Sequence, residues 1–360
     1  MADSRLTGPV RVVGVGLLGS SVGLGLRARG IDVILADASP THLGIAVDYG
    51  AGRAAAEGDA PQLIVVCVPP DVTADVVAAE LAAYPEAIVT DVASVKLRVL
   101  DELTECGADV SRYIGSHPLA GRERGGPMSG RADLFVGRPW VVAAHHGISY
   151  QRGAVIDDLI LDLGATLVEM TPEQHDAAVA LISHVPQVVS SLMARRLVDG
   201  APSALNLAGQ GLRDVTRVAA SDPELWVQIL GANAAPVRDI LAAYRDDLDR
   251  FIDALGDVDA PGARRRIAEE LLGGNTGVGR LPGKHGVDRR FTPVVVMVDD
   301  RPGQLAQLFQ DVGDIGVNIE DFRMEHSPGA PVGLAELAIV PEAVESLTEE
   351  LSQRGWRIAG

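Results

Sequence analysis

The sequence predicts a protein in three parts: an α/β domain with a doubly wound sheet, an all-α domain and a small C-terminal βαββαβ module. Short β-branched runs alternate with helical patterns over residues 8–170, which is typical of a mostly parallel sheet. Only helical patterns follow over residues 171–257. A linker rich in Gly, Pro and Arg spans residues 258–290, and mixed strand and helix patterns return over residues 291–360.

Composition and charge narrow the class of protein. A chain of 360 residues has room for two or three domains. With 31 Lys and Arg against 49 Asp and Glu, the net charge is −18, which argues against nucleic acid or an anionic membrane as a partner. Of the two cysteines, Cys67 lies in an apolar run, so no disulfide framework is expected. We see no signal peptide and no bilayer-spanning apolar run, and we predict a cytoplasmic protein.

The first elements are a strand at Val10–Val13, a helix at Ser20–Arg29 and a strand at Ile31–Ala36. Between the first strand and the helix, Gly14–Gly19 has the pattern G-x-G-x-x-G, and Asp37 ends the second strand. The order strand, glycine turn, helix, strand and acid is the dinucleotide-binding fingerprint. It predicts a Rossmann-type dinucleotide-binding domain.

Each part of this fingerprint has a physical task. Gly14 permits the tight turn, Gly16 lets the backbone approach a pyrophosphate, and Gly19 lets the helix pack on the strand. The helix N-terminus offers free N–H groups and a positive dipole end to the phosphates. Asp37 can accept hydrogen bonds from both ribose hydroxyls and would repel a 2′-phosphate, which predicts NAD as the cofactor.

The other elements of this domain follow in order. Helices are expected at residues 39–49, 71–83 and 96–106, and strands at residues 63–68, 87–92, 113–117, 140–144 and 166–169. Ligands of such sheets lie at the carboxyl ends of the strands. The residues that fall at such ends are Pro69, Asp91, Ser94 and His117. The predicted cofactor-binding residues are Gly14, Gly16, Leu17, Leu18, Gly19, Asp37, Val68, Pro69 and Asp91.

Two strand-end residues have the chemistry for a proton transfer. His117 precedes Pro118, which fixes the backbone, and the pKa range of histidine suits a general base at neutral pH. The alternative is a packed or capping histidine. Ser94 could bond a substrate hydroxyl or orient His117, and the alternative is a cap for the helix expected from Val95.

The helical domain begins at a capping box, Thr171–Gln174, with Pro172 at the first helical position. The segment Ala177–Leu192 is apolar on more than one side, which predicts that it buries surface against a second subunit. Pro186 lacks an N–H, so a kink is expected near it.

A polar stripe runs along this apolar helix. Spacings of four, three and four residues place on one face Asp176, Ala180, Ser183 and Gln187. A polar stripe beside a kink is more typical of a pocket wall than of a core, which makes His175 and His184 candidate site residues. The alternative for each histidine is a satisfied, buried imidazole.

A later helix carries Arg213 and Arg217, four residues apart and on one face. A planar guanidinium is well suited to bind a carboxylate. The alternative is a surface arginine paired with Asp214 or Asp222, which we favour for Arg213. We find no cluster with the spacing of metal ligands, so no metal is expected.

The C-terminal module is expected to contain strands at residues 294–298, 318–324, 334–340 and 356–358, and helices at residues 304–315 and 342–354. Its turn Asp300-Arg301-Pro302-Gly303 is polar and contains glycine, so backbone groups there can meet a small zwitterion. Asn318 can reach the same edge.

Together these motifs resemble the prephenate/arogenate dehydrogenases of tyrosine biosynthesis, over nearly the whole chain. The resemblance rests on Gly14–Gly19 with Ser20-Ser21, Asp91–Lys96, Ser116–Gly121, His175-Asp176, Ser183–Pro186, Arg213–Arg217 with Trp226, and Leu281–Gly286. The C-terminal segments Asp300–Gly303 and Gly316–Ile319 look like those of an ACT domain, the usual amino-acid sensor.

The resemblance implies a homodimer that carries out NAD-dependent oxidative decarboxylation of prephenate to 4-hydroxyphenylpyruvate. His117 would accept the proton of the substrate hydroxyl, Ser94 would hold the pair in register, and Arg217 would bind a substrate carboxylate. The other implied substrate-binding residues are His175, Ser183, His184 and Gln187. Tyrosine is the expected effector, at a regulatory site made of Asp300, Arg301, Pro302, Gly303, Asn318 and Ile319.

Three alternatives stay open. Members that use prephenate commonly carry a second histidine where this chain has Gln187, so an arogenate or dual cyclohexadienyl dehydrogenase is the first. The second, a β-hydroxyacid dehydrogenase, would want a catalytic lysine on the helical domain, and the chain has no lysine between Lys96 and Lys284. The third is a protein that binds NAD and senses an amino acid without catalysing a reaction. The predicted polar pocket residues Ser94, His117, His184 and Arg217 argue against it.

Overall fold

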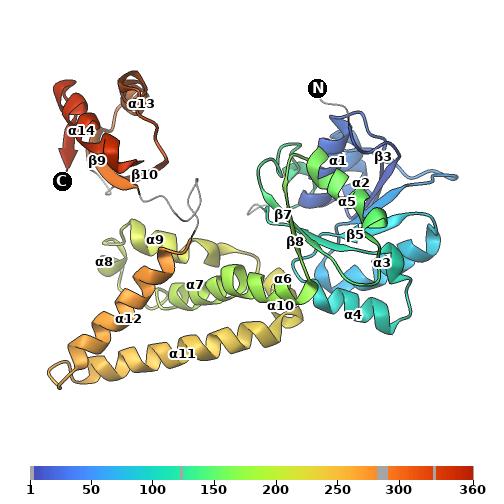
Figure 1. Ribbon diagram of the computed structural model, residues 1–360, viewed down its shortest axis with the longest axis horizontal. Coiled ribbons are helices and arrows are strands. Elements are labelled where there is room, and N and C mark those ends of the chain that lie inside the picture. The colour runs from blue at the N-terminus through green and yellow to red at the C-terminus, as the bar shows by residue number, and fades with distance from the viewer. Residues whose placement is uncertain (1–3, 122–124, 282–290, 327–329, 360) are drawn as a thin grey trace. The chain divides into compact units, whose positions relative to one another are not determined.

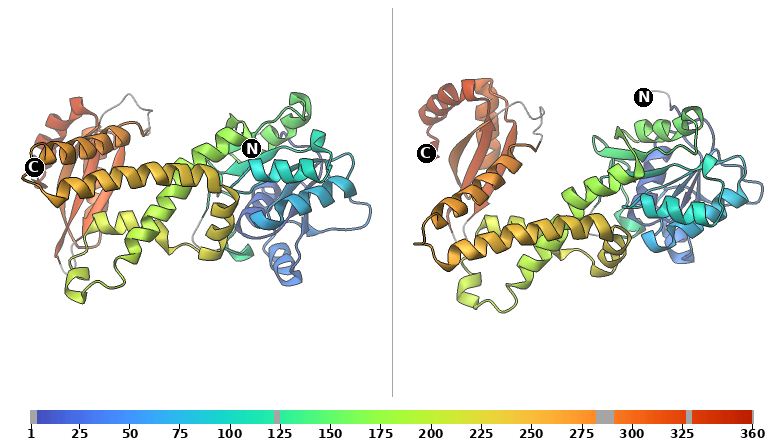
Figure 2. Two further views of the ribbon diagram at one scale, coloured as in Figure 1. Left: turned by 90° about the horizontal axis from the view of Figure 1, so that it is seen from below. Right: turned by 60° about the horizontal axis from the view of Figure 1, so that its bottom comes forward.

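The computed structural model describes residues 4–121, 125–281, 291–326 and 330–359. The chain divides into two compact units, whose elements are drawn in Figures 1 and 2. The first unit comprises Met1–Arg195 and Val218–Ala243, and the second comprises Arg196–Arg217 and Tyr244–Gly360.

A parallel five-stranded sheet forms the centre of the first unit. Its strands are β1 (Val10–Val13), β2 (Val33–Ala36), β3 (Arg53–Ala54), β4 (Leu63–Val66) and β5 (Ile88–Asp91), in the spatial order β3-β2-β1-β4-β5. The connection changes direction between β1 and β4, and in such sheets this switch point is where ligands bind. The predicted Rossmann-type domain is confirmed.

Helices cover both faces of this sheet. They are α1 (Leu17–Arg27), α2 (Pro40–Asp48), α3 (Thr73–Ala83) and α4 (Leu97–Glu105). Successive side chains of β4 enter opposite cores: Leu63 and Val65 belong to one buried cluster, and Ile64 and Val66 to the other. Burial on both faces explains why this strand has a continuous apolar run instead of alternating residues.

The prediction of one continuous sheet to residue 170 is wrong. The strands β6 (Gly115–Pro118), β7 (Pro139–Ala143) and β8 (Thr166–Met170) form a separate sheet in the order β6-β7-β8. An isolated parallel bridge joins Val89 to Tyr113, and β6 then pairs antiparallel with β7. The parallel pair β7 and β8 needs a crossover, which helix α5 (Tyr150–Asp162) supplies; the sequence analysis had missed this helix.

The helical part opens with one long helix of three segments. These are α6 (Pro172–Val179), a π-helical turn (Ala180–His184) and α7 (Val185–Arg195). The capping box at Thr171 is present, as predicted. The disturbance expected near Pro186 is the π-helical turn, because a proline cannot donate to the carbonyl one turn before it. By length and composition alone Pro172–Arg195 could cross a membrane, as many core helices of soluble proteins could; a third of its most apolar stretch is buried.

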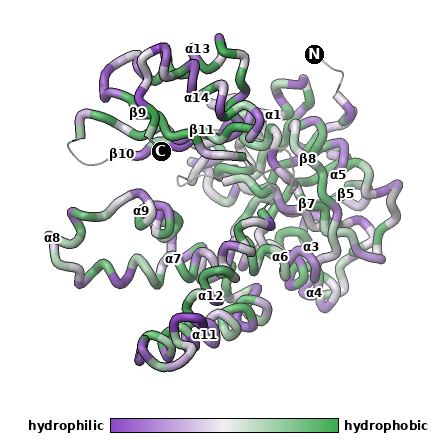
Figure 3. Tube along the Cα trace, turned by 60° about the vertical axis from the view of Figure 1, so that its left-hand side comes forward, coloured by the Kyte–Doolittle hydropathy of each residue, from purple (hydrophilic) through white to green (hydrophobic). Residues whose placement is uncertain are grey.

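The helices that follow are α8 (Pro202–Leu205), α9 (Gln210–Thr216), α10 (Pro223–Ala232), α11 (Ala234–Gly256) and α12 (Ala263–Val278). Figure 3 shows that α11 contains both hydrophilic and hydrophobic residues. The predicted linker over residues 258–290 is wrong where α12 lies. Glu270 of α12 pairs with Arg250 of α11 at 2.8 Å between Oε1 and Nε, which helps to hold this glycine-rich segment helical. Residues 282–290, with most of the motif Leu281–Gly286, lie outside the described residues.

The C-terminal module has the predicted order βαββαβ. Its elements are β9 (Thr292–Asp299), α13 (Gln304–Ile315), β10 (Asp321–His326), β11 (Val332–Ile339), α14 (Val344–Gln353) and β12 (Arg357–Ala359). The strands pair antiparallel in the order β10-β11-β9-β12, a ferredoxin-like arrangement. Alternate residues of β9 and β11 face the helices and form the module's own core.

Candidate active site

The glycine turn after β1 has the geometry that each glycine predicts. Gly14 has φ +90°, and a Cβ on it would lie 2.5 Å from the carbonyl oxygen of Cys67. A Cβ on Gly19 would lie 1.9 Å from the oxygen of Gly14, so α1 could not pack there with a larger residue. A Cβ on Gly16 would meet nothing within 4 Å, so the backbone at the start of α1 is open to an approaching group. The turn fits the pyrophosphate of a dinucleotide.

Asp37 lies at the end of β2, beside this turn, and is partly buried. Its Oδ2 accepts a hydrogen bond from the backbone N–H of Val15 at 2.8 Å, and its Oδ1 accepts one from the N–H of Ser39 at 2.7 Å. The carboxylate therefore ties the glycine turn to the end of β2. Each oxygen retains acceptor capacity, which fits the hydroxyls of a ribose.

Asp91 stays a predicted cofactor contact, and its carboxylate already has several partners within the protein. The residue is 0% exposed, and its carboxylate forms an ion pair with the Nζ of Lys96 and accepts hydrogen bonds from the Tyr113 hydroxyl at 2.6 Å and the Ala93 N–H at 2.8 Å. A carboxylate with these partners holds the loop after β5 in place. Val68 is partly buried and Pro69 is exposed beyond β4, and both stay predicted cofactor contacts.

A pocket of about 350 Å³ lies within the first unit. It is lined by Ser94, His117, Pro118, Leu119, Ala120, Val179, Ile182, Ser183, His184, Trp226 and Ile229. The structure thus brings together four predicted site residues from segments far apart in the sequence: Ser94 and His117 after strands, and Ser183 and His184 on the long helix. Trp226 and Ile229, three residues apart on α10, were not among the predicted site residues.

His117 is the first member of a buried hydrogen-bonded chain. Its Nδ1 lies 2.9 Å from the Nε2 of His175, and the Nδ1 of His175 lies 2.7 Å from the Oδ1 of Asp176. Asp176 also accepts hydrogen bonds from the backbone N–H groups of Lys96 at 2.9 Å and Leu97 at 3.0 Å, at the start of α4.

Two predicted roles change as a result. His175 is 0% exposed and lies behind His117, so it does not contact a substrate in the pocket. Ser94 does not orient His117, because among the described residues its hydroxyl has no hydrogen-bond partner; it lines the pocket and is free to bond a ligand. Ser94 is also not the N-cap of α4, which begins two residues later than expected, at Leu97.

The pKa of His117 lies well below the ordinary value of 6.5. Burial is the largest cause, and the neighbouring His175, Lys96 and His184 add to it because each disfavours a further positive charge. His117 is therefore neutral at physiological pH. A neutral imidazole at a pocket wall can accept a proton.

His184 is also neutral, because burial lowers its pKa to about 4. The amide nitrogen of Asn233 donates to the backbone carbonyl of Asp176 at 2.8 Å and lies 3.1 Å from the Nδ1 of His184. Since this nitrogen is a donor, His184 Nδ1 accepts and its Nε2 carries the proton. The ring also meets Trp226 edge to face, with 5.9 Å between centroids. His184 is thus a fixed hydrogen-bond donor at the pocket.

Two predicted substrate residues do not line this pocket. Gln187 is 7% exposed, and its amide donates to the hydroxyl of Ser191 at 3.4 Å. Arg217 is exposed and belongs to the second unit, so a contact with the substrate stays a prediction. Pairing of Arg213 with Asp214 or Asp222 is not observed among the described residues; Asp214 instead accepts from Gln210 at 2.8 Å.

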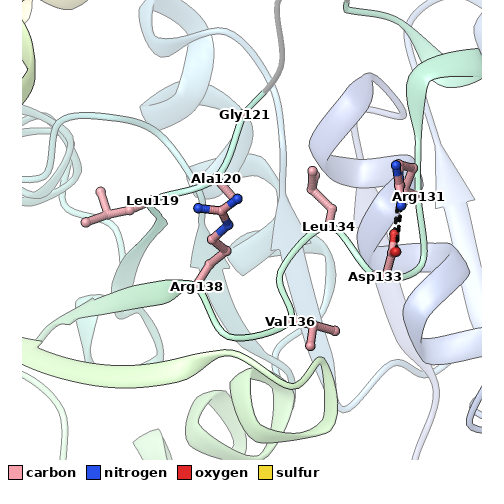
Figure 4. A pocket seen from close by; sticks show the side chains of 8 residues that line it. All are labelled: Leu119, Ala120, Gly121, Arg131, Asp133, Leu134, Val136 and Arg138. Atoms are coloured by element: carbon pink, nitrogen blue, oxygen red, sulfur yellow. Dashed lines mark hydrogen bonds and ion pairs between the residues drawn. The ribbon is translucent and has the colours of Figure 1, made fainter. Parts of the chain in front are cut away.

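A second pocket, of about 500 Å³, adjoins the first (Figure 4). Leu119 and Ala120 line both pockets. On the side away from Leu119 and Ala120, the guanidinium of Arg131 pairs with Asp133 at 2.6 Å, whereas Arg138, just before β7, extends beside Ala120. None of the predicted site residues lines this pocket.

The glycine turn, Asp37 and a neutral histidine in a pocket of the same unit define an NAD-dependent dehydrogenase. Comparisons with known proteins specify which kind. The family model "Prephenate dehydrogenase, nucleotide-binding domain" matches residues 22–169, and "Prephenate dehydrogenase, dimerization domain" matches residues 171–269. The chain belongs to the prephenate dehydrogenase family.

Individual relatives agree with this assignment. The probable prephenate dehydrogenase NovF of Streptomyces niveus is 36% identical over 353 residues, which cover 96% of this chain and 98% of the relative. The cyclohexadienyl dehydrogenase of Zymomonas mobilis is 30% identical over 266 residues, covering 69% of this chain and 89% of the relative.

Solved structures are similar over about three quarters of the chain. The crystal structure of Synechocystis arogenate dehydrogenase has a TM-score of 0.63 at 28% identity and covers 75% of this chain and 99% of its own. Prephenate dehydrogenase from A. aeolicus, in complex with hydroxyphenyl propionate and NAD+, has a TM-score of 0.67 at 24% identity. The match covers 76% of this chain and 98% of that one. At 24% identity, the likeness to this last structure shows that the fold is shared and nothing more.

Proposed function

We propose that this chain is a prephenate dehydrogenase that makes 4-hydroxyphenylpyruvate for tyrosine biosynthesis in the cytoplasm. The observation that carries the proposal is the neutral His117 in a pocket of the unit that holds the dinucleotide turn. NAD, when bound, accepts a hydride from the ring carbon that bears the hydroxyl. The names of the relatives support this chemistry for the family.

His117 does the proton chemistry in this proposal. Its Nε2 takes the hydroxyl proton as the ring C–OH becomes a carbonyl, and the ring carboxylate then leaves as CO₂ with its bonding electrons passing into the ring. The phenol oxygen regains the proton from His117, so the proton count is unchanged over the reaction. Because aromatisation drives the second step, the protein mainly provides orientation and proton transfer.

The pocket residues favour prephenate over arogenate. Arogenate carries an ammonium group, which when buried needs an anionic or strong acceptor partner. Among the described residues that line the pocket, no side chain is acidic, and the Nε2–H of His184 is a donor that suits a keto or carboxylate oxygen. The alternative, an arogenate or dual cyclohexadienyl dehydrogenase, is favoured by Gln187 and by the similarity to the Synechocystis enzyme.

The deciding experiment measures NADH formation by the purified full chain with prephenate and with arogenate. We expect kcat/KM to be at least about tenfold higher for prephenate, the effect of one mismatched buried polar group. Equal efficiency would assign a dual cyclohexadienyl dehydrogenase, and a preference for arogenate would reject the proposal.

Three further roles belong to the same proposal. Arg217 binds a carboxylate of the substrate. The chain forms a homodimer, which the matched dimerisation-domain model and the exposed apolar residues Leu181, Ile182 and Leu192 of the long helix support. Tyrosine binds the C-terminal module and lowers the activity; in support, the residues of the turn Asp300–Gly303 are exposed.

A further inference from the structure

The chain His117–His175–Asp176 determines which nitrogen of His117 carries a proton. Asp176 has backbone N–H groups as partners on both oxygens, from Lys96 and Leu97. A carboxylate whose two oxygens both accept backbone N–H groups acts as an acceptor toward a further partner as well. The Nδ1 of His175, 2.7 Å from Asp176 Oδ1, must therefore carry a proton.

The same reasoning extends one step outward. His175 has no exposed surface, and its two ring nitrogens contact His117 and Asp176. In the neutral ring with a proton on Nδ1, Nε2 is an acceptor. The Nδ1 of His117, 2.9 Å away, must then be the donor of that hydrogen bond. The remaining nitrogen of His117, Nε2, has its lone pair free.

We propose that His175 and Asp176 are positioning residues that hold His117 in the tautomer whose Nε2 accepts the substrate proton. The proposal rests on the proposed role of His117 as the base. When His117 becomes positively charged, the carboxylate of Asp176, two hydrogen bonds away, stabilises that charge without itself taking a proton. The T-shaped contact of the two rings, with centroids 5.1 Å apart, also restricts rotation of His117.

The competing interpretation of the same contacts is that Asp176 only caps the N-terminus of α4 and plays no part in catalysis. Both roles predict a loss of stability when Asp176 changes, so stability cannot separate them. The position of the proton on His117 and the rate of the chemical step can, because a helix cap influences neither.

The first test is ¹⁵N NMR of the histidine-labelled full chain at neutral pH, with the His117 signals identified by their loss in His117→Asn. We expect the proton of neutral His117 on Nδ1. A proton on Nε2 would overturn the proposal. This measurement needs no substrate, so it stands whether or not the chain turns over prephenate.

The second test is kinetic, with the substrate that proves active. His175→Ala removes the hydrogen bond to His117, and we expect kcat to fall about 10²–10⁴-fold with KM nearly unchanged. His175→Gln has one oxygen to accept from His117 and one N–H to donate to Asp176, so we expect it to regain at least about tenfold of that loss. The matched control is His145→Gln, since both ring nitrogens of His145 likewise have partners, here backbone groups, but the residue lies outside the pocket.

The outcomes separate the two levels of the proposal. If His175→Ala keeps kcat within twofold of the unchanged chain, or if both His175 variants are equally slow, the positioning role is wrong while the prephenate assignment stands. If neither prephenate nor arogenate is turned over, the proposed function fails, and the NMR result still decides the tautomer.

Discussion

At the scale of single residues, the two pocket histidines differ in what the second ring nitrogen contacts. His117 bonds another histidine, which leaves its outward nitrogen as an acceptor, whereas His184 meets the amide of Asn233, which leaves its outward nitrogen as a donor. Both are neutral because burial lowers their pKa values. One pocket is thus lined by two neutral histidines whose inner nitrogens have different partners.

Replacing the base should slow the chemistry without weakening substrate binding. For His117→Asn we expect kcat to fall about 10²–10⁴-fold, the usual contribution of a general base, and KM to change little. Steady-state kinetics with saturating NAD measures both. His146→Asn is the control, since His146 is exposed and near in sequence. Near-normal turnover by His117→Asn would show that His117 is not the general base.

Replacing the predicted carboxylate ligand should have the opposite effect. A charge-assisted hydrogen bond contributes about 1.5–3 kcal/mol, so Arg217→Ala should raise KM roughly 10- to 150-fold and leave kcat less affected. Arg213→Ala is the matched control, four residues earlier in the chain and also exposed. A rise in KM for the Arg213 variant alone would show that we assigned the wrong arginine.

At the scale of elements, the N-terminus of α4 joins the sheet to the helical part. Asp176 of α6 binds its first N–H groups, and the Nζ of Lys96 forms a buried ion pair with Asp91 and donates to the carbonyl of Ser116 at 2.8 Å. Lys96 and Asp91 are 1% and 0% exposed. Burial lowers the pKa of Lys96, and the nearby carboxylates of Asp91 and Asp176 oppose that effect. The strand end that carries His117 therefore depends on this ion pair.

Breaking the pair should destabilise the fold strongly. Lys96→Met leaves the Asp91 carboxylate buried without its cation, which costs about 3–5 kcal/mol, and urea unfolding should show that loss. Adding Asp91→Asn to Lys96→Met should recover part of it, because no buried charge then remains. Arg98→Ala, in an exposed ion pair with Glu102 on the same helix, is the control and should change stability little. An unchanged free energy of unfolding in Lys96→Met would contradict this account.

The end of β2 should decide between the two nicotinamide cofactors. A carboxylate there repels a 2′-phosphate, so we expect kcat/KM to favour NAD over NADP. Asp37→Ala should raise KM for NAD and shrink that preference, with Asp48→Ala, exposed at the end of α2, as the control. Equal efficiency of the unchanged chain with both cofactors would refute the role of Asp37.

At the scale of the whole molecule, two features exceed what a single catalytic pocket needs. One is an apolar stripe on α11, where Tyr244, Leu248, Ile252 and Leu255 are each about half exposed. Such a stripe at helical spacing is suited to pack against another helix, in keeping with the matched dimerisation-domain model. The other is the C-terminal ferredoxin-like module, which has a core of its own.

The module should make the enzyme sensitive to tyrosine. We expect tyrosine to lower the activity of the full chain and to leave a chain that ends at residue 289 unaffected, since an effector acts only through different affinities for two states. Phenylalanine, which lacks the hydroxyl, is the ligand control. Equal responses of both chains, or none from the full chain, would leave the module a purely structural role.

The sequence by itself determined the elements whose signals are local. The glycine turn needs particular backbone angles and close approaches, so Gly14, Gly19 and Asp37 could be placed from spacing alone. The capping box at Thr171 and the βαββαβ order are likewise set by neighbouring residues. His117, Ser94, Ser183 and His184 were identified as site residues from their motifs and do line one pocket.

Only the tertiary structure decided what those residues contact. No local pattern states that His175 lies behind His117, that Asn233 bonds His184, or that the Asp91 carboxylate is taken up by Lys96, because each contact joins segments that fold together from different elements. Helix α12 forms where the glycine-rich sequence favours a linker, and its Glu270 pairs with Arg250 of α11. The split of the sheet after β5 is also decided by the tertiary structure, because long-range hydrogen bonds and burial override local propensity there.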